Sequence, residues 1–269
     1  MPFIEERGLS FYYESSGSRA APPLLIISGL SDYTAKCNWQ TAELSEDYFV
    51  ITFDNRGAGQ SSTPPPGYSV ADMAEDATAV LDALAIPAAH VFGFSLGGMI
   101  ALNLVLNHPE RVRRLVLGCT TAGGDLFIQP DELVVSALTQ PIRTGDRRQD
   151  FLAGVRNSVS KRSLVERPEL IDSLAQLAER NLQTPLGYAG QIQAALAHDV
   201  AGRLDEISSP TLVLHGADDR VFPLENGRLL AGQIPAARFI EYPEAGHLFF
   251  IEKADEVNRD IRAHLMETS

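Results

Sequence analysis

Apolar and polar residues follow two periods along the chain, and segments of the two kinds alternate. Continuous or weakly alternating apolar runs predict strands at 9–15, 23–28, 48–54, 90–94, 113–118, 210–216 and 237–243. Between them, residues 69–84 carry an apolar stripe at helical spacing behind a Ser69/Asp72 capping box, and residues 96–107 are apolar on nearly every side of a helix. This alternation favours an α/β fold, in which helices cover both faces of a parallel sheet.

The strand pattern is interrupted once. From about residue 121 to residue 206 no strand is indicated, and helical patterns stand there instead, for example at 131–140 and 168–182. The strand signal then returns, together with helical patterns at 225–234 and 255–265. We therefore predict a core made of residues 1–120 and 207–269, with residues 121–206 inserted between its strands as a helical cap.

A serine stands between two glycines where a predicted strand meets a helix, in the segment Gly93-Phe94-Ser95-Leu96-Gly97. Serine and glycine are common at ordinary helix starts, so a simple capping role for Ser95 is the alternative reading. A sharp strand-to-helix turn would force the serine into a sparsely populated conformation and leave room only for small side chains two residues to either side. That geometry predicts an exposed nucleophile, with the Leu96 N–H aimed at a developing oxyanion.

A serine nucleophile needs a histidine base and a carboxylate that orients the histidine. Asp218 and Asp219 follow the strand predicted at 210–216, and His247 follows the strand predicted at 237–243. Serine, acid and histidine therefore occur in the chain order typical of a nucleophile at a strand–helix turn.

Other titratable residues carry weaker signals. Asp125, after the strand predicted at 113–118, is an alternative acid. His215 and the four remaining histidines lack a paired acidic loop, so we interpret them as packing or solvated residues. Asp54 and Arg56 could be taken for an anion site, but we interpret them as structural groups.

Four segments together resemble the α/β-hydrolase family, namely GFSLG (93–97), FDNRGAGQSS (53–62), HGADDRVFP (215–223) and EAGHLFFIEKADEVN (244–258). The resemblance spans nearly the whole chain and points to the cap-bearing esterase, enol-lactonase and haloperoxidase branch. It implies a mostly parallel eight-stranded sheet flanked by helices, with an inserted helical cap. It also implies that Ser95, Asp219 and His247 form the catalytic triad, since Asp219 has the family's spacing from the glycine before it and the proline after it.

The same resemblance implies an oxyanion hole made by the backbone N–H groups of Leu30 and Leu96. In this chain Ser28 precedes the loop glycine, where the family commonly has histidine, but a backbone donor does not depend on that side chain. No metal and no cofactor are implied. The aromatic residues near these segments, which are candidates to line the substrate pocket, are Trp39, Phe94, Phe249 and Phe250.

The resemblance implies a serine hydrolase that cleaves a small or medium carboxylic ester or lactone through an acyl-enzyme intermediate. Alternatives are a 3-oxoadipate enol-lactonase, a C–C bond hydrolase, a cofactor-free haloperoxidase or perhydrolase, a proline iminopeptidase, and a ligand receptor with the same fold. Relatives that attack with aspartate, the haloalkane dehalogenases and epoxide hydrolases, are disfavoured by the serine at position 95.

Composition narrows the range of partners. The net charge is −13, the isoelectric point is near 4.9, and the basic residues form no dense run, which disfavours nucleic acid and anionic membranes. No apolar run reaches the roughly 18 residues of a membrane helix, and the acidic N-terminus is unlike a secretory signal. Cys37 and Cys119 have neither disulfide-framework nor zinc spacing. We expect a cytoplasmic monomer or homodimer that acts on a small-molecule ester or lactone.

Overall fold

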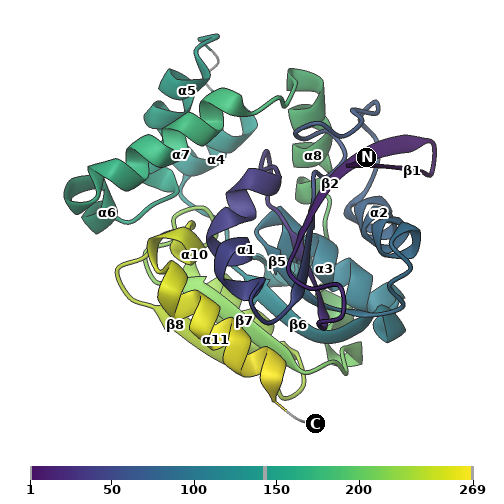
Figure 1. The fold of residues 1–269 in the computed structure, drawn as a ribbon. Coiled ribbons are helices and arrows are strands. Elements are labelled where there is room, and N and C mark those ends of the chain that lie inside the picture. Colours follow the sequence, from purple (N-terminus) through teal and green to yellow (C-terminus); the bar gives the residue numbers. More distant parts are fainter. Residues whose placement is uncertain (1, 142–143, 268–269) are drawn as a thin grey trace.

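The computed structural model describes residues 2–141 and 144–267, whose strands form one sheet in the order β1-β2-β4-β3-β5-β6-β7-β8 (Figure 1). β2 pairs antiparallel with both β1 and β4, and the remaining pairings are parallel. The prediction of a mostly parallel eight-stranded sheet is therefore confirmed. The strands are β1 (Phe3–Glu6), β2 (Leu9–Ser16), β3 (Pro23–Ile27), β4 (Phe49–Phe53), β5 (Ala89–Phe94), β6 (Val112–Gly118), β7 (Thr211–Gly216) and β8 (Arg238–Tyr242).

Helices cover both faces of the sheet, and each face has its own apolar core. Successive residues of β3 alternate between the two cores: Leu25 and Ile27 pack with α2, α3 and α9, whereas Leu24 and Ile26 pack with α1, α10 and α11. Burial of apolar side chains on both faces explains why the strands appear in the sequence as continuous apolar runs. These helices are α1 (Asn38–Leu44), α2 (Val70–Ala83), α3 (Leu96–Asn107), α9 (Leu224–Gln233), α10 (Phe249–Glu252) and α11 (Ala254–Met266).

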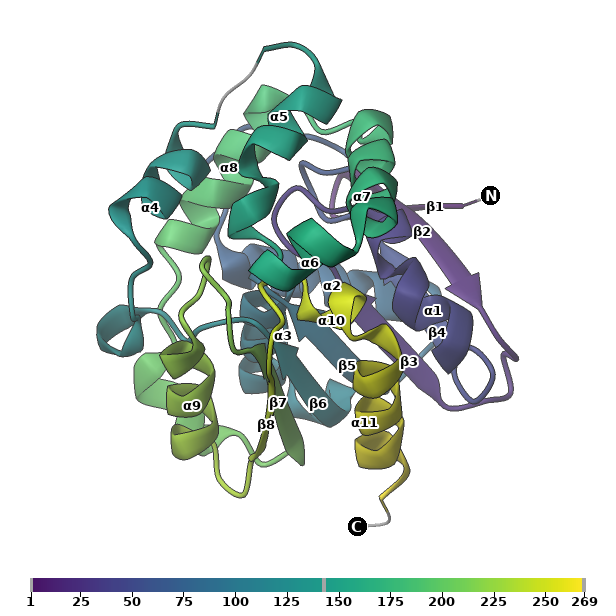
Figure 2. The same ribbon diagram turned by 90° about the vertical axis from the view of Figure 1, so that its left-hand side faces the viewer.

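The chain between β6 and β7 forms further helices that add no strand to the sheet. Figure 2 shows them gathered beyond the ends of the strands. None of the helices in the described part of the chain is long and apolar enough to cross a bilayer. The inserted helices are α4 (Glu132–Thr139), α5 (Arg147–Gly154), α6 (Lys161–Glu166), α7 (Pro168–Arg180) and α8 (Pro185–Leu196).

Helix α2 holds the loop that follows β4 through side-chain hydrogen bonds. The predicted capping box is present, because the Ser69 hydroxyl accepts from the Asp72 N–H while the Asp72 carboxylate accepts from the Ser69 N–H. One turn later, Asp76 accepts two hydrogen bonds from the Arg56 guanidinium, at 2.5 and 2.6 Å. Asp54 accepts from two backbone N–H groups of neighbouring loops, and burial raises its pKa to about 6. These contacts support the interpretation of Asp54 and Arg56 as structural groups.

His90 and His198 couple the stability of the fold to pH. Both side chains are buried, and burial lowers the pKa of each from 6.5 to about 4. The unfolded chain therefore binds a proton on each histidine at a pH where the folded protein does not. Above pH 6.5 both the folded and the unfolded chain keep these histidines neutral, and the free energy of unfolding is not lowered. As the pH falls from 6.5 toward 4, the unfolded chain takes up protons first and the folded protein loses stability.

When the pH is lowered from 7 to 5, we expect protonation of each of these histidines in the unfolded chain to lower the free energy of unfolding by about 2 kcal/mol. A His198→Gln variant should lose less stability over this interval than the wild type, by about that amount, in urea denaturation at each pH. The glutamine oxygen can still accept from the Asn103 amide, which lies 3.3 Å from His198 Nδ1. Other titratable groups such as Asp54 contribute equally to both proteins, so they cancel when the change in the free energy of unfolding with pH is compared. If the free energy of unfolding depended on pH in the same way in the variant and the wild type, the prediction would be contradicted.

Candidate active site

Ser95 occupies a strained turn between β5 and α3, with φ of 55° and ψ of −124°. Such a conformation costs about 1–3 kcal/mol and persists only where its surroundings impose it. The Ser95 N–H donates to the Gly118 carbonyl at 2.9 Å, and the Ser95 carbonyl accepts from the Gly98 N–H and the Thr120 hydroxyl. The neighbouring strand and the first turn of α3 therefore hold the serine in this geometry.

The two glycines of the turn are required by close backbone approach. A Cβ atom on Gly97 would lie 2.0 Å from the carbonyl oxygen of Ile27, and one on Gly93 would lie 2.2 Å from the carbonyl oxygen of Gly97. These carbonyl groups belong to β3 and to the first turn of α3, and neither can move away without disrupting the pairing of the strands or the start of the helix. The predicted steric reason for glycine at both positions is confirmed.

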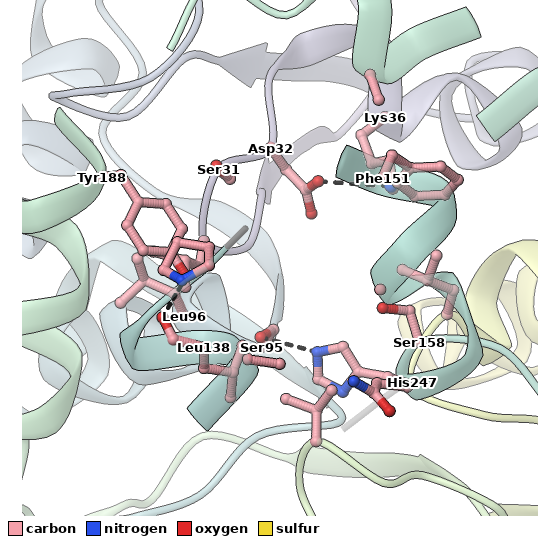
Figure 3. Close-up of a pocket in the computed structure, with 18 of the residues that line it drawn as sticks. Ser31, Asp32, Lys36, Ser95, Leu96, Leu138, Phe151, Ser158, Tyr188 and His247 are labelled. Atoms are coloured by element: carbon pink, nitrogen blue, oxygen red, sulfur yellow. Dashed lines mark hydrogen bonds and ion pairs between the residues drawn. The ribbon is translucent and has the colours of Figure 1, made fainter. Parts of the chain in front are cut away.

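The structure brings together the three side chains that the sequence singles out, although they follow three different strands. His247 Nε2 lies 3.0 Å from Ser95 Oγ (Figure 3). On the other side of the ring, His247 Nδ1 lies 2.8 Å from Asp219 Oδ2. Because a carboxylate only accepts hydrogen bonds, Nδ1 carries the proton and Nε2 accepts from the serine hydroxyl. In this arrangement His247 can take the serine proton while Asp219 holds the ring in place.

Asp219 is buried and accepts more than one hydrogen bond. Its Oδ1 accepts from the backbone N–H groups of Val221 and Phe222, at 2.8 and 2.9 Å. Burial by itself raises the pKa of Asp219, but His247 and His215, by charge and hydrogen bonding, hold it well below its ordinary value. The carboxylate is thus kept ionised, which suits a group that orients a histidine and stabilises its protonated form.

His215 lies closer to the site than the sequence indicated. It is fully buried, its Nε2 donates to the Phe222 carbonyl at 2.8 Å, and the same nitrogen lies 3.2 Å from Asp219 Oδ2. The interpretation of His215 as a packing residue therefore omitted its contact with the acid. A signal was available, since His215 ends the strand whose following loop carries Asp219.

Neither of the alternative acids, Asp218 and Asp125, is hydrogen-bonded to His247. Asp218 is exposed, and Asp125 is exposed in a short turn after β6. The carboxylate bonded to the histidine is that of Asp219. The family spacing therefore selected the aspartate that the structure places beside His247.

The two residues predicted to supply the oxyanion hole lie beside Ser95. Leu30 follows β3, Leu96 begins α3, and both residues line the cavity above Ser95. Among the described residues, neither N–H has a hydrogen-bond acceptor. A Cβ on Gly29 would lie 3.2 Å from Ser95 Cβ, which shows how closely the Leu30 loop approaches the serine. Both donors are available to an oxygen bound beside Ser95.

A cavity of about 390 Å³ lies over Ser95 and His247. Many of the lining residues are apolar, and among the others Asp32 and Lys36 form an ion pair at 3.5 Å (Figure 3). Most of the lining residues belong to the inserted segment, where the sequence showed helical patterns but did not indicate which side chains face a cavity. The inserted helices contribute Val134, Leu138, Phe151, Leu174, Tyr188 and Ile192 to the lining.

The aromatic residues proposed for the pocket lie elsewhere, and that prediction is wrong. Phe94, Phe249 and Phe250 are at most 1% exposed and belong to the core beneath the site, where the rings of Phe94 and Phe250 are 4.2 Å apart. Trp39 lines a separate surface groove beside α1. These large rings pack α10 and α11 against the sheet, so they support the His247 loop without facing the cavity.

Cys119, Asp219 and His247 form a group in which possible metal-ligand atoms lie within 4.8 Å of one another. Burial raises the pKa of the Cys119 thiol well above its ordinary value, which keeps the sulfur protonated and a poor ligand. The facing atoms of Asp219 and His247 are already hydrogen-bonded to each other. The chemistry of these groups favours the Asp219–His247 hydrogen bond over a cation site.

Comparison with known proteins agrees with this geometry. A family model described as alpha/beta hydrolase fold matches residues 22–254. The relative named "Putative carbamate hydrolase RutD", from Caulobacter segnis, is 32% identical over 88% of this chain and 89% of its own length. 3-Oxoadipate enol-lactonase 2 of Acinetobacter baylyi is 29% identical over 97% of this chain and 94% of its own. The crystal structure of the enol-lactonase from Burkholderia xenovorans, 26% identical, superposes with a TM-score of 0.88 over 99% of this chain and 100% of that one. The protein therefore belongs to the α/β-hydrolase family.

Proposed function

We propose that this protein is a serine hydrolase that cleaves a small or medium carboxylic ester or lactone through an acyl-enzyme intermediate. The observation that carries the proposal is the unbroken run of hydrogen bonds from Ser95 through His247 to Asp219 at the floor of a cavity. Membership of the α/β-hydrolase family, and relatives named as a carbamate hydrolase and an enol-lactonase, support a hydrolytic reaction.

In the proposed reaction, Ser95 Oγ attacks the substrate carbonyl while His247 Nε2 takes the hydroxyl proton. The N–H groups of Leu30 and Leu96 donate to the resulting oxyanion, and each such donor lowers the barrier by about 3–4 kcal/mol in comparable enzymes. His247 then gives its proton to the leaving alkoxide, which departs as an alcohol or, for a lactone, stays attached to the acyl group. Water activated by His247 releases the acid and restores Ser95.

We further propose that residues 121–206 act as a cap that selects the substrate. This segment supplies much of the cavity wall above the serine, including Leu138, Phe151 and Tyr188. The Asp32–Lys36 pair also lines the cavity and presents both signs of charge to a bound molecule. An ester or lactone with a largely apolar body and a hydrogen-bonding group suits this lining.

The proposal is tested by following product formation from p-nitrophenyl esters of increasing chain length, γ-lactones and an aryl carbamate under the same conditions. We expect many turnovers per protein molecule on at least one ester or lactone, at a rate above that on the carbamate. A carbamate rate that exceeds all ester and lactone rates would contradict the assigned substrate class. One equivalent of product followed by a stall would favour a ligand receptor instead of an enzyme.

A further inference from the structure

Ser31, next to the proposed oxyanion donor Leu30, is held on all sides by the inserted segment. Its backbone is left-handed, with φ of 67°. Its N–H donates to Gln191 Oε1 at 3.0 Å, its carbonyl accepts from the Asn181 amide at 2.5 Å, and its hydroxyl donates to Gln183 Oε1. Every polar group of Ser31 therefore bonds to a residue more than 140 positions away in the chain.

The two glutamines form a network with only one consistent orientation. Gln183 Nε2 donates to Gln191 Oε1 at 2.9 Å, and Gln191 Nε2 donates to the Arg56 carbonyl at 2.8 Å. Rotating the Gln191 amide by 180° would turn its NH₂ group toward the Ser31 N–H, and rotating the Gln183 amide alone would turn its oxygen toward Gln191 Oε1. Gln191 is 0% exposed and Gln183 is 5% exposed, so water does not replace these partners.

Helix α8, which carries Gln191, is packed directly on the core. A Cβ on Gly187 would lie 2.1 Å from the carbonyl oxygen of Gly57, and one on Gly190 would lie 2.6 Å from the Tyr68 hydroxyl. Glycine at these two positions lets α8 lie directly against the loop after β4. The inner face of α8 therefore brings Gln191 close to the loop after β3.

We propose that Gln191, with Gln183 and Asn181, positions the Leu30 N–H for the oxyanion by fixing the left-handed conformation of Ser31. The inference rests on the proposed function. A left-handed serine is an uncommon conformation, and without its partners the loop would relax and carry the adjacent Leu30 peptide with it. Since the oxyanion forms in the tetrahedral intermediate and in the transition states around it, but not in the bound ester, misplacing its donor slows the chemical step more than it weakens substrate binding.

The test compares Gln191→Met with Gln193→Met, the same change on the exposed side of the same helix. For a p-nitrophenyl ester we expect Gln191→Met to lower kcat about 10- to 100-fold while KM changes less than about threefold. Affinity for a trifluoromethyl ketone, which forms a tetrahedral adduct with a serine nucleophile, should fall by a similar factor. Gln193→Met should match the wild type in all three quantities.

The outcomes separate the inference from the function on which it rests. If the wild type turns over esters but Gln191→Met keeps wild-type kcat and ketone affinity, the positioning role is overturned and the proposed function stands. If the wild type turns over neither esters nor lactones, both are overturned. Urea denaturation checks folding, and if Gln191→Met does not fold, Gln183→Met must show the same kcat loss for the inference to hold.

Discussion

Replacement of Ser95 by alanine is expected to lower kcat for ester hydrolysis about 10⁴- to 10⁶-fold, which is the usual cost of removing the nucleophile of a triad. The fold should persist. Alanine meets the same backbone strain at φ of 55° as serine does, and the hydrogen bonds that hold the turn come from backbone atoms of residue 95. The loss should therefore appear in steady-state kinetics without a change in the midpoint of urea denaturation.

Two controls make the Ser95→Ala result specific. Ser173→Ala removes a hydroxyl from the exposed side of α7 and should leave kcat unchanged. A fluorophosphonate probe, followed by intact-mass measurement, should add one group to the wild type and none to Ser95→Ala. If Ser95→Ala kept a kcat for ester hydrolysis above one hundredth of the wild-type value, the assignment of Ser95 as the nucleophile would be wrong.

Replacement of Asp219 by asparagine is expected to lower kcat about 10³- to 10⁴-fold. Asparagine can keep the hydrogen bonds from Val221 and Phe222, but its NH₂ group facing His247 Nδ1 favours the tautomer with the proton on Nε2. That tautomer cannot accept the serine proton. The variant also lacks the negative charge that stabilises the protonated imidazole formed during the reaction.

Asp218→Asn is the matched control, because it makes the same change at the adjacent, exposed aspartate. We expect it to retain nearly wild-type kcat. The two variants are compared by ester hydrolysis and by near-ultraviolet circular dichroism, so that a folding defect is not mistaken for lost chemistry. Loss of activity in Asp218→Asn with full activity in Asp219→Asn would assign the acid to Asp218.

The order of most core elements could be predicted because local patterns encode them. Strands buried on both faces are continuous apolar runs, and α2 carries an apolar stripe behind its capping box. The first strand was not predicted. β1 (Phe3–Glu6) is four residues long and buries only Ile4, so it has no alternation to detect, although the left-handed Arg7 and Gly8 form its tight turn to β2.

The site could be predicted in part for the same reason. The steric demand of the strand–helix turn is local, and it is met by Gly93 and Gly97. The pocket could not be predicted in this way, because every residue of β5 is buried and its pattern does not reveal which side faces a cavity. Phe94 was therefore assigned to the pocket although it belongs to the core, and the support that Gln191 gives to Ser31 had no signal at all.

The amino-acid sequence by itself determined the fold class, the strained turn at Ser95 and the chain order of serine, aspartate and histidine, because each depends on the spacing and size of neighbouring residues. Only the tertiary structure decided that Asp219 and His247 come within hydrogen-bonding distance, that His215 touches the same carboxylate, and which side chains surround the cavity. These contacts are set by how helices, strands and loops pack, which no local pattern records.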